Sequence, residues 1–409
     1  MSASRVGAVL AELYARVPRG MRLSEASLTA MREACARAGN PERAFAAVHV
    51  AGTNGKGSVC AMVESIARAA GTRTGLYTSP HLCRFAERIR IDGEPVTDAA
   101  LESALAQAID LGPDLSFFET ATLAAFIALR DAKVELAVLE VGIGGRLDAT
   151  NVIPPPRAAA ITRIALDHMD MLGGTLAVIA REKAGIAKPG MSIVVGAADP
   201  EVRAAIDETA QAAGATTQEA DGPDAKALLA RVAELGLRGQ HQWENATVAY
   251  RLTRELGIGD APIERGLREV RWPGRLEWVD GYDGPYLLDG AHNPDGAAAL
   301  ARYLGEQSSS LALVFGALAD KAWPQMLDLL APVTPHRVYA EPPGRAAASP
   351  RDLALRHPGE RAAGLAAAMA RARNLVGSGG IVVIAGSLYL VGEARALLLG
   401  LARDPPVAM

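Results

Sequence analysis

The sequence predicts an α/β protein made of two consecutive domains, each with a mainly parallel sheet covered by helices on both faces. Short, β-rich apolar runs alternate with longer helical patterns along almost the whole chain. Strands as apolar as these are typical of sheets that are buried on both sides. At residues 271–278, RWPGRLEW, a Pro-Gly turn interrupts the pattern and a second alternating series begins. We therefore expect a larger domain over residues 1–272 and a smaller, Rossmann-like, doubly wound domain over residues 273–409.

The elements of the larger domain follow in order along the chain. Its strand candidates are FAAVHVAG (45–52), TRTGLYTS (72–79), ELAVLEVG (135–142), RAAAITRI (157–164) and SIVVGA (192–197). Helices are expected to begin near Ser58, Thr97, Phe117 and Thr175, and most of 242–268 is predicted to be helical. The polar stretch 214–224, GATTQEADGPD, predicts a surface loop.

The smaller domain repeats the alternation. After the strand of RWPGRLEW come the strand candidates PYLLDG (285–290), LALVFGAL (311–318), HRVYA (336–340) and GIVVIAG (380–386). Helical segments separate them, and the first of these is expected to begin at Asp295. This order is typical of a doubly wound sheet.

Composition excludes several classes of protein. The 409 residues carry a net charge of −4, whereas a general nucleic-acid-binding protein is expected to present a basic face. Cys35, Cys60 and Cys83 are odd in number and lack CxxC or Cys/His spacing, so neither a disulfide framework nor a cysteine zinc site is predicted. The N-terminal segment lacks the order of regions of a signal peptide, and the longest uncharged apolar stretch, 381–392, is broken by glycine. We expect a soluble, cytoplasmic protein with neither a membrane span nor a nucleic-acid partner.

The clearest motif is VAGTNGKGS, residues 50–58. A predicted strand ends in Gly52 and a predicted helix follows, which is the context of a phosphate-binding loop. Glycines allow consecutive backbone N–H groups to point at an anion, and the helix N-terminus adds positive potential. Lys56 supplies a mobile charge for the terminal phosphates, and the Ser58 hydroxyl is placed to contact Mg²⁺. Because the spacing is G-x-x-G-K-G-S rather than G-x-x-x-x-G-K-[ST], a simple strand-to-helix turn with an exposed lysine stays open as the alternative.

Two features follow the strand ELAVLEVG. Glu140 lies at its carboxyl end, where ligands bind in open α/β sheets, so a metal or phosphate role competes with simple contact with water. The glycines of GIGGRLDATN (142–151) indicate a backbone that something approaches closely. Asp148 and Asn151 are expected to cap a turn.

Two later segments carry further candidates. In ALDHMDMLG (165–173), His168 lies between acids; a structural histidine and a ligand to a hard cation are both open readings. Lys183 of REKAGIAKPG is expected on a helix as a solvated lysine.

The second series has its own polar cluster, LLDGAHNPDG (287–296). Two interpretations are open for it. One is a polar loop in which Asp295 is the N-cap of a helix. The other is a ribose-binding acid, Asp289, at a strand end that faces the first domain. Arg275 of WPGR is placed to reach a nucleotide phosphate as the domains close.

Ten segments together carry a family resemblance. In chain order they are VAGTNGKGS, YTSPHL followed by ERI, FFETATLAAF, LEVGIGGRLDATN, LDHMDMLG, REKAGI, WPGR, LDGAHNPDG, FGALADK and GSLYLVG. With them the chain closely resembles the dihydrofolate synthase/folylpolyglutamate synthase family of the Mur ligase superfamily, over about residues 45–392. The resemblance implies a P-loop-containing, parallel-sheet ATPase domain followed by a Rossmann-like glutamate-ligase domain.

The resemblance also assigns site residues. It implies that ATP is held by Gly52, Thr53, Asn54, Gly55, Lys56, Gly57, Ser58, Asn245, Arg275 and Asp289. It implies two Mg²⁺ sites formed by Ser58, Ser79, Glu140, His168 and, if carbamylated, Lys183. The pterin would lie against Ser116, Phe117, Phe118, Glu119, Leu147, Asp148 and Ala149. The catalytic residues would be Lys56, Lys183 and His292.

The implied reaction is ATP-dependent amide formation between L-glutamate and the carboxylate of dihydropteroate or a reduced folate. An acyl phosphate forms first, and a phosphate loop, a lysine and two magnesium ions suit that phosphoryl transfer. The resemblance further implies a monomer that acts on small molecules. A peptidoglycan-precursor ligase of the same superfamily is one alternative, although such enzymes carry a uridine-binding domain before the loop. A P-loop ATPase or switch acting on a protein partner is the other, although it would need only the first domain.

Overall fold

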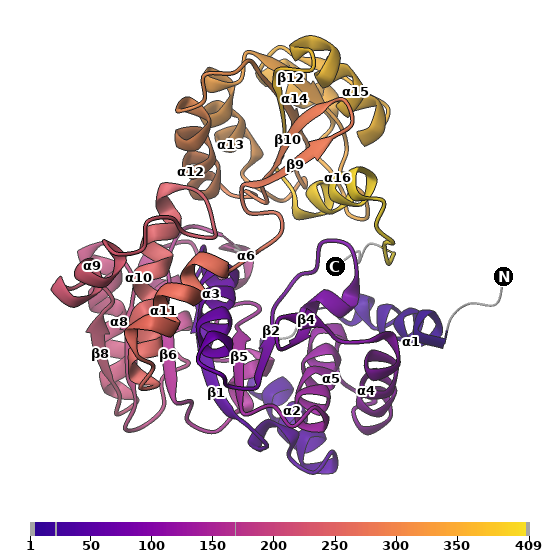
Figure 1. Cartoon of the computed structure of the whole chain (residues 1–409). Coiled ribbons are helices and arrows are strands. Elements are labelled where there is room, and N and C mark those ends of the chain that lie inside the picture. The colour runs from indigo at the N-terminus through magenta and orange to yellow at the C-terminus, as the bar shows by residue number, and fades with distance from the viewer. Residues whose placement is uncertain (1–4, 21–22, 168, 406–409) are drawn as a thin grey trace.

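The computed structural model describes residues 5–20, 23–167 and 169–405. It contains an eight-stranded and a six-stranded sheet, and the part of the chain built on the second lies above the part built on the first (Figure 1). The fold class expected from the sequence is confirmed. The boundary between the two parts falls between α11 (Asp260–Glu269) and β9 (Glu277–Gly281).

The first sheet has the order β4-β3-β2-β5-β1-β6-β7-β8. Its strands are β1 Ala46–Ala51, β2 Thr74–Tyr77, β3 Ile89–Ile91, β4 Glu94–Pro95, β5 Leu136–Glu140, β6 Ala158–Ile161, β7 Ser192–Val195 and β8 Thr216–Glu219. Pairing is parallel from β2 to β8, whereas β3 and β4 add an antiparallel edge. The chain runs from β1 to β2 on one side of the sheet and from its neighbour β6 to β7 on the other. The carboxyl ends of β1 and β6 are therefore at a topological switch point, which is a ligand-binding position.

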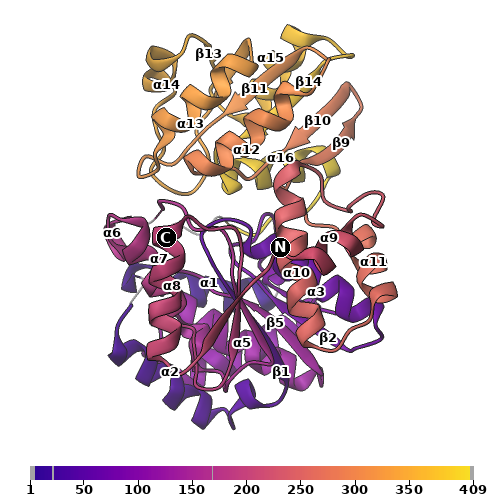
Figure 2. The ribbon, with the colours of Figure 1, turned by 90° about the vertical axis from the view of Figure 1, so that its left-hand side faces the viewer.

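Helices cover both faces of this sheet (Figure 2). They are α1 Arg5–Tyr14, α2 Glu25–Arg37, α3 Lys56–Ala69, α4 Asp98–Leu111, α5 Phe117–Asp131, α6 Met169–Leu172, α7 Leu176–Ala184, α8 Pro200–Ala212, α9 Pro223–Leu229, α10 Gln240–Glu255 and α11. Short 3₁₀ turns are Val17–Arg19, Pro41–Arg43, Phe85–Arg88 and Ala149–Val152. The expected helix starts near Ser58, Thr97, Phe117 and Thr175 are confirmed within two residues.

Successive side chains of β1 point to opposite faces of the sheet, and both faces are covered by apolar clusters. In β1, Ala47 packs in the cluster that contains α4 and α5 residues, whereas Val48 and Val50 pack with α3, α10 and α11. Successive side chains point to opposite faces of a strand, so a strand without polar positions has to be covered on both sides. His49 is the exception, and it is buried with its Nε2 2.8 Å from Oγ1 of Thr150.

The expectation of a surface loop over 214–224 is wrong. Thr216–Glu219 forms β8, the parallel edge strand beside β7, and α9 begins at Pro223. The strand is polar because it lies at the edge of the sheet and its side chains are half-buried or exposed. The polar sequence predicted a loop because a strand at the edge of a sheet does not need apolar side chains on both faces.

The second sheet has the order β13-β12-β11-β14-β10-β9, with only β9 antiparallel among the described strands. Its strands are β9, β10 Gly284–Leu288, β11 Leu311–Phe315, β12 His336–Tyr339, β13 Glu360–Arg361 and β14 Ile381–Ala385. Its helices are α12 Pro294–Gly305, α13 Trp323–Leu330, α14 Pro350–Arg356, α15 Leu365–Val376 and α16 Leu388–Leu399, with a 3₁₀ turn at Ala331–Val333. Helices α12, α13 and α14 pack on one face of the sheet, and α15 and α16 on the other.

The cysteines and the length and apolarity of the helices bear on two of the classes that composition excludes. Cys35, Cys60 and Cys83 are all buried free thiols. Within the described residues, no helix is both long and apolar enough to cross a membrane.

Candidate active site between the two sheets

A cavity of about 200 Å³ lies where the two sheets face each other. From the first part of the chain it is lined by residues 52–58, Ser79, Glu140, 142–144, Arg163, Asp167, Lys183, 241–242 and 244–245. From the second part it is lined by Arg275, 289–293, 295–296 and Leu388. The carboxyl ends of β1, β5 and β10 meet here, and all ten residues that the resemblance assigned to ATP line this cavity.

Close contacts and backbone hydrogen bonds fix the conformation of the loop after β1. Gly55 is the N-cap of α3 with φ +89°, and a Cβ there would lie 2.3 Å from Oδ1 of Asn245. The N–H groups of Thr53 and Asn54 donate to the carbonyl of Arg163 at 2.9 and 3.2 Å, which fixes the start of the loop. Lys56 Nζ donates to the Thr53 carbonyl at 3.0 Å, so its charge lies over the loop. Only glycine permits both the left-handed backbone and the close approach of α10.

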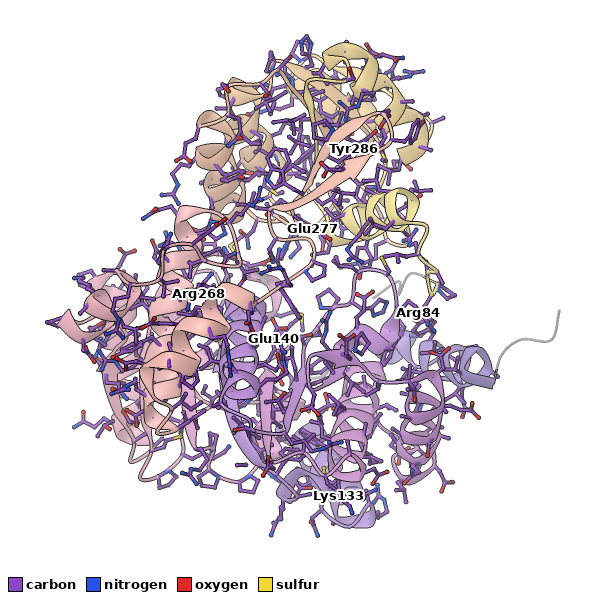
Figure 3. All side chains as sticks on the ribbon, viewed as in Figure 1. Arg84, Lys133, Glu140, Arg268, Glu277 and Tyr286 are labelled. Carbon is purple, nitrogen blue, oxygen red and sulfur yellow. The ribbon has the colours of Figure 1, made fainter. Side chains whose placement is uncertain are left out.

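Glu140 is a buried carboxylate at the end of β5. Figure 3 shows it at the edge of the lower part that faces the upper part. The backbone N–H of Ser79 donates to its Oε2 at 3.1 Å. Burial raises the pKa of Glu140, and the nearby charges of Lys56 and Arg275 partly offset that rise. A carboxylate buried in this way is stabilised when a cation binds it.

Lys183, on α7, is 5% exposed. Burial first, and repulsion from Lys56 second, lower its pKa to about 7. The expectation of a solvated lysine is therefore wrong, because α7 packs this face against the loop after β5 rather than against water. The backbone of that loop passes close: a Cβ on Gly145 would lie 2.7 Å from the Lys183 carbonyl.

The second sheet contributes an acid and a histidine. Asp289 follows β10 and is buried; its carboxylate accepts the N–H groups of Leu276 and Ala291, each at 2.9 Å. His292 Nδ1 donates to the Gly290 carbonyl at 2.9 Å. This bond leaves Nε2 directed to the cavity, 3.6 Å from Oδ2 of Asp167.

Hydrogen bonds join the phosphate loop to the second sheet. Asn54 Nδ2 donates to Oδ1 of Asn293 and to Oδ2 of Asp295, at 3.1 and 2.7 Å. Asn293 Nδ2 donates back to Oδ1 of Asn54 at 2.9 Å. Asn293, not Asp295, is the N-cap of α12, since its Oδ1 accepts the N–H of Gly296. Asp295 was expected as the cap but lies in the first turn, where it also pairs with Arg163 at 2.7 Å.

Two protein-family models match the chain, one for each of the parts that line the cavity. Residues 50–252 match the Mur ligase middle domain and residues 274–388 match the Mur ligase glutamate ligase domain. Folylpolyglutamate synthase of Lacticaseibacillus casei is 36% identical over 398 residues, which cover 88% of this chain and 92% of that protein. The chain belongs to the dihydrofolate synthase/folylpolyglutamate synthase family of Mur ligases.

Two further members of the family extend the comparison. The Mycobacterium tuberculosis folylpolyglutamate synthase complexed with ADP superposes with a TM-score of 0.87 at 32% identity, covering 98% of this chain and 100% of that one. A probable bifunctional folylpolyglutamate synthase/dihydropteroate synthase of Halobacterium salinarum is 38% identical over 383 residues. These cover 85% of this chain and 46% of that protein, so the chain spans about half the length of this relative.

Most of the residues that the resemblance assigned to the pterin are buried or make hydrogen bonds with other residues of this chain. Ser116 and Glu119 form a capping box at the start of α5. The carboxylate of Asp148 accepts the N–H groups of Gly142 and Ile143 and the hydroxyl of Thr150, and it is the N-cap of the turn Ala149–Val152, as its sequence predicted. Phe117 packs in the core, and Leu147 and Ala149 are buried. Phe118 lines a second cavity.

This second cavity, of about 140 Å³, contains residues that the sequence did not single out. Lys321 Nζ donates to Asp167 Oδ1 at 2.6 Å, and Arg345, Ser387 and Tyr389 lie on the same wall. They come from FGALADK and GSLYLVG and from the chain between them. Nothing in their local pattern indicated which first-sheet residues they would face.

Arg88 lines the same cavity and is almost fully buried, at 1% exposed. Its Nε donates to Nδ1 of His81 at 2.9 Å, whereas its Nη1 has no partner among the described residues. The guanidinium lies 5.1 and 5.4 Å from the ring centres of Phe85 and Phe117. A buried cation held by aromatic rings is available to an anionic ligand.

The structure places only some of the predicted metal ligands in the cavity. His168 lies outside the described residues. Among the residues described, no group of three or more His, Cys, Asp or Glu comes together to hold a metal. Glu140 is accompanied in the cavity by Ser58 and Ser79 instead.

Proposed function

We propose that the chain is an ATP-dependent ligase that joins L-glutamate to the carboxylate of dihydropteroate or of a reduced folate. The observation that carries the proposal is one cavity lined by the phosphate loop, Glu140 and Lys183 from one sheet and by Arg275 and Asp289 from the other. A site divided between two bodies suits a reaction that has to exclude water from a reactive intermediate. The ADP complex of the Mycobacterium tuberculosis relative supports a nucleotide here.

In this proposal the chain positions the nucleotide from both sides. The N–H groups of residues 55–58, at the start of α3, and the Lys56 ammonium bind the phosphates, and Lys56 neutralises charge on the transferred group. Arg275 binds a phosphate from the second part. Asp289 accepts a ribose hydroxyl, and Asn245, against Gly55, contacts the adenine.

A magnesium ion fits the donors that are present. Glu140 is a buried carboxylate with a raised pKa, and it shares the cavity with the hydroxyls of Ser58 and Ser79. An ion held there with phosphate oxygens would supply charge neutralisation during phosphoryl transfer. We assign a second ion to His168 and to Lys183 as its carbamate. The lowered pKa of Lys183 favours the neutral amine that this modification requires.

The acceptor carboxylate is phosphorylated to an acyl phosphate, and the amine of glutamate then displaces phosphate to form the amide. His292, with Nε2 near Asp167, is placed to bind phosphate oxygens during that transfer. Arg88, Lys321 and Arg345 in the second cavity suit the carboxylates of the incoming glutamate. Phe118 suits the pterin or benzoyl ring beside them.

We also propose the remaining assignments made from sequence. The domain boundary lies at residues 272 and 273, between the two family matches and the two sheets. The protein acts as a monomer in the cytoplasm, where three buried free thiols are compatible with a reducing environment.

The test is a paired ADP-release assay with Mg-ATP and L-glutamate. One reaction contains dihydropteroate and the other tetrahydrofolate, and product mass is measured in both. ADP release that requires both glutamate and a pterin substrate, with a product heavier by one glutamyl residue, is the expected result. ADP release without a carboxylate substrate would contradict the proposal and favour a P-loop ATPase or switch.

A further inference from the structure

A groove of about 560 Å³ lies beside the chain that links the two sheets. It is lined by residues 234–238, by the end of α11, by the linker 271–278 and by Arg395 of α16. Figure 3 labels one residue from each wall, Arg268 below and Glu277 above. The phosphate loop does not line this groove, so it is a different feature from the nucleotide cavity.

The groove is strongly basic in a chain whose net charge is −4. Its arginines are Arg238, Arg268, Arg271, Arg275 and Arg395, against the acids Glu234 and Glu277. Glu277 is occupied, since Arg395 Nε donates to both of its oxygens at 2.9 and 3.1 Å. Within the described part of the chain, the other four arginines form no ion pair. Arg275 is already assigned to a nucleotide phosphate, and Arg268 Nε and Arg271 Nη1 donate to backbone carbonyls. Among the described residues no carboxylate neutralises Arg238, Arg268 or Arg271, and each guanidinium keeps further N–H donors for an anionic ligand.

Two tryptophans hold cations here without neutralising them. The guanidinium of Arg90 lies 5.1 Å from the ring centre of Trp272, and that of Arg238 lies 5.6 Å from the ring centre of Trp278. Arg90 Nε is buried and has no partner among the described residues. Stacking orients a guanidinium while its N–H donors stay free for carboxylates.

The groove adjoins the reaction site. A smaller cavity lined by Ser79, Arg90 and Glu140 shares Trp272, Pro273 and Arg275 with it. We propose that the groove binds the γ-linked oligoglutamate chain of polyglutamylated folates, an inference that rests on the proposed function. Each ligation adds one carboxylate to the acceptor, so a longer substrate presents a more negative chain, and arginines bind carboxylates in a bidentate fork. The acidic net charge of the whole protein disfavours nucleic acid as the occupant.

The direct test uses γ-linked hexaglutamate without a pterin as the probe, titrated into the full-length protein by calorimetry. Arg238→Ala/Arg271→Ala removes two exposed cations from the groove, and Arg32→Ala/Arg351→Ala removes two exposed cations elsewhere as a matched control. We expect the wild type and the control to bind hexaglutamate, with an affinity that falls as salt rises, and the groove variant to bind about tenfold more weakly. Absence of binding to the wild type, or equal binding by the groove variant, overturns the proposal.

Turnover gives the second readout. For the groove variant we expect KM to rise about tenfold for a triglutamyl folate, with KM for the monoglutamyl folate and kcat for both left unchanged. An equal rise for both substrates would indicate general damage and overturn the proposal. If the wild type fails to extend any folate, the proposed function fails, whereas the hexaglutamate titration still decides whether the groove binds this chain.

Discussion

Replacing Lys183 by methionine should make the protein more stable while abolishing ligation. Lys183 is 5% exposed, and burial lowers its pKa from 10.5 to about 7. At about 1.4 kcal/mol per pH unit, this fall corresponds to about 5 kcal/mol of destabilisation when the ammonium is fully protonated. Methionine keeps most of the apolar stem and removes the charge, so the variant recovers much of that free energy.

The sign of the pH dependence follows from the direction of the pKa shift. Between pH 7 and 10.5 the unfolded chain binds a proton at Lys183 that the folded chain has released. The free energy of unfolding of the wild type therefore rises with pH through this window, and below pH 7 the penalty is constant. The advantage of Lys183→Met should be largest at pH 6 and should shrink by about 2 kcal/mol between pH 7 and pH 9.

The assay is urea denaturation at pH 6, 7, 8 and 9 in buffers free of hydrogencarbonate, which prevents carbamate formation. Lys226→Met, at an exposed lysine, is the matched control, and its pH dependence should follow the wild type. A stability difference between Lys183→Met and wild type that stays constant from pH 7 to pH 9 would refute the argument. Adding hydrogencarbonate should stabilise the wild type and Lys226→Met, which both keep Lys183, and should leave Lys183→Met unchanged.

Three further substitutions test the nucleotide site. Lys56→Ala should lower kcat at least a hundredfold by loss of charge neutralisation, with an unchanged circular dichroism spectrum; near-full activity would sink the loop assignment. Glu140→Gln should abolish Mg²⁺-dependent turnover and, because burial raises the pKa of this carboxyl, leave the thermal midpoint equal or higher; an unchanged metal titration would count against its role. Gly55→Ala, whose Cβ would lie 2.3 Å from Asn245 Oδ1, should weaken nucleotide binding at least tenfold, as measured by calorimetry. Gly71→Ala is its control, because that glycine has nearly the same φ, +87°, and no atom within 4 Å of its Cβ; equal loss in both would show backbone strain alone.

The features that depend on the local pattern of apolar, polar and glycine residues were predictable from the sequence. The strands are apolar because helices cover both faces, so their positions could be read from composition and length. The phosphate loop follows β1 and Glu140 is the last residue of β5, and the carboxyl ends of parallel strands lie at one edge of the sheet. Polar β8 was missed for the converse reason, since an edge strand carries no such signature.

What the sequence could not supply is which distant residues meet. Lys183 looks like any helical lysine, and its burial depends on the packing of α7 against the loop after β5. Lys321 was passed over because its partner, Asp167, lies 154 residues earlier in the chain. Asp295 was given the capping role of Asn293, two residues away, because both residue types cap helices equally well.

The contacts between the two parts bear on how the site works. Asn54 belongs to the phosphate loop, yet its side chain bonds to Asn293 and Asp295 at the start of α12. Asp167, on the first part, likewise pairs with Lys321 on the second. Near the phosphates the parts are therefore joined by polar contacts, which exchange partners at little cost compared with apolar packing. Because Asn54 belongs to the loop and bonds to the start of α12, a phosphate that displaced this side chain would break contacts between the two parts. We therefore expect Asn54→Ala to change the nucleotide affinity and the contact between the parts together.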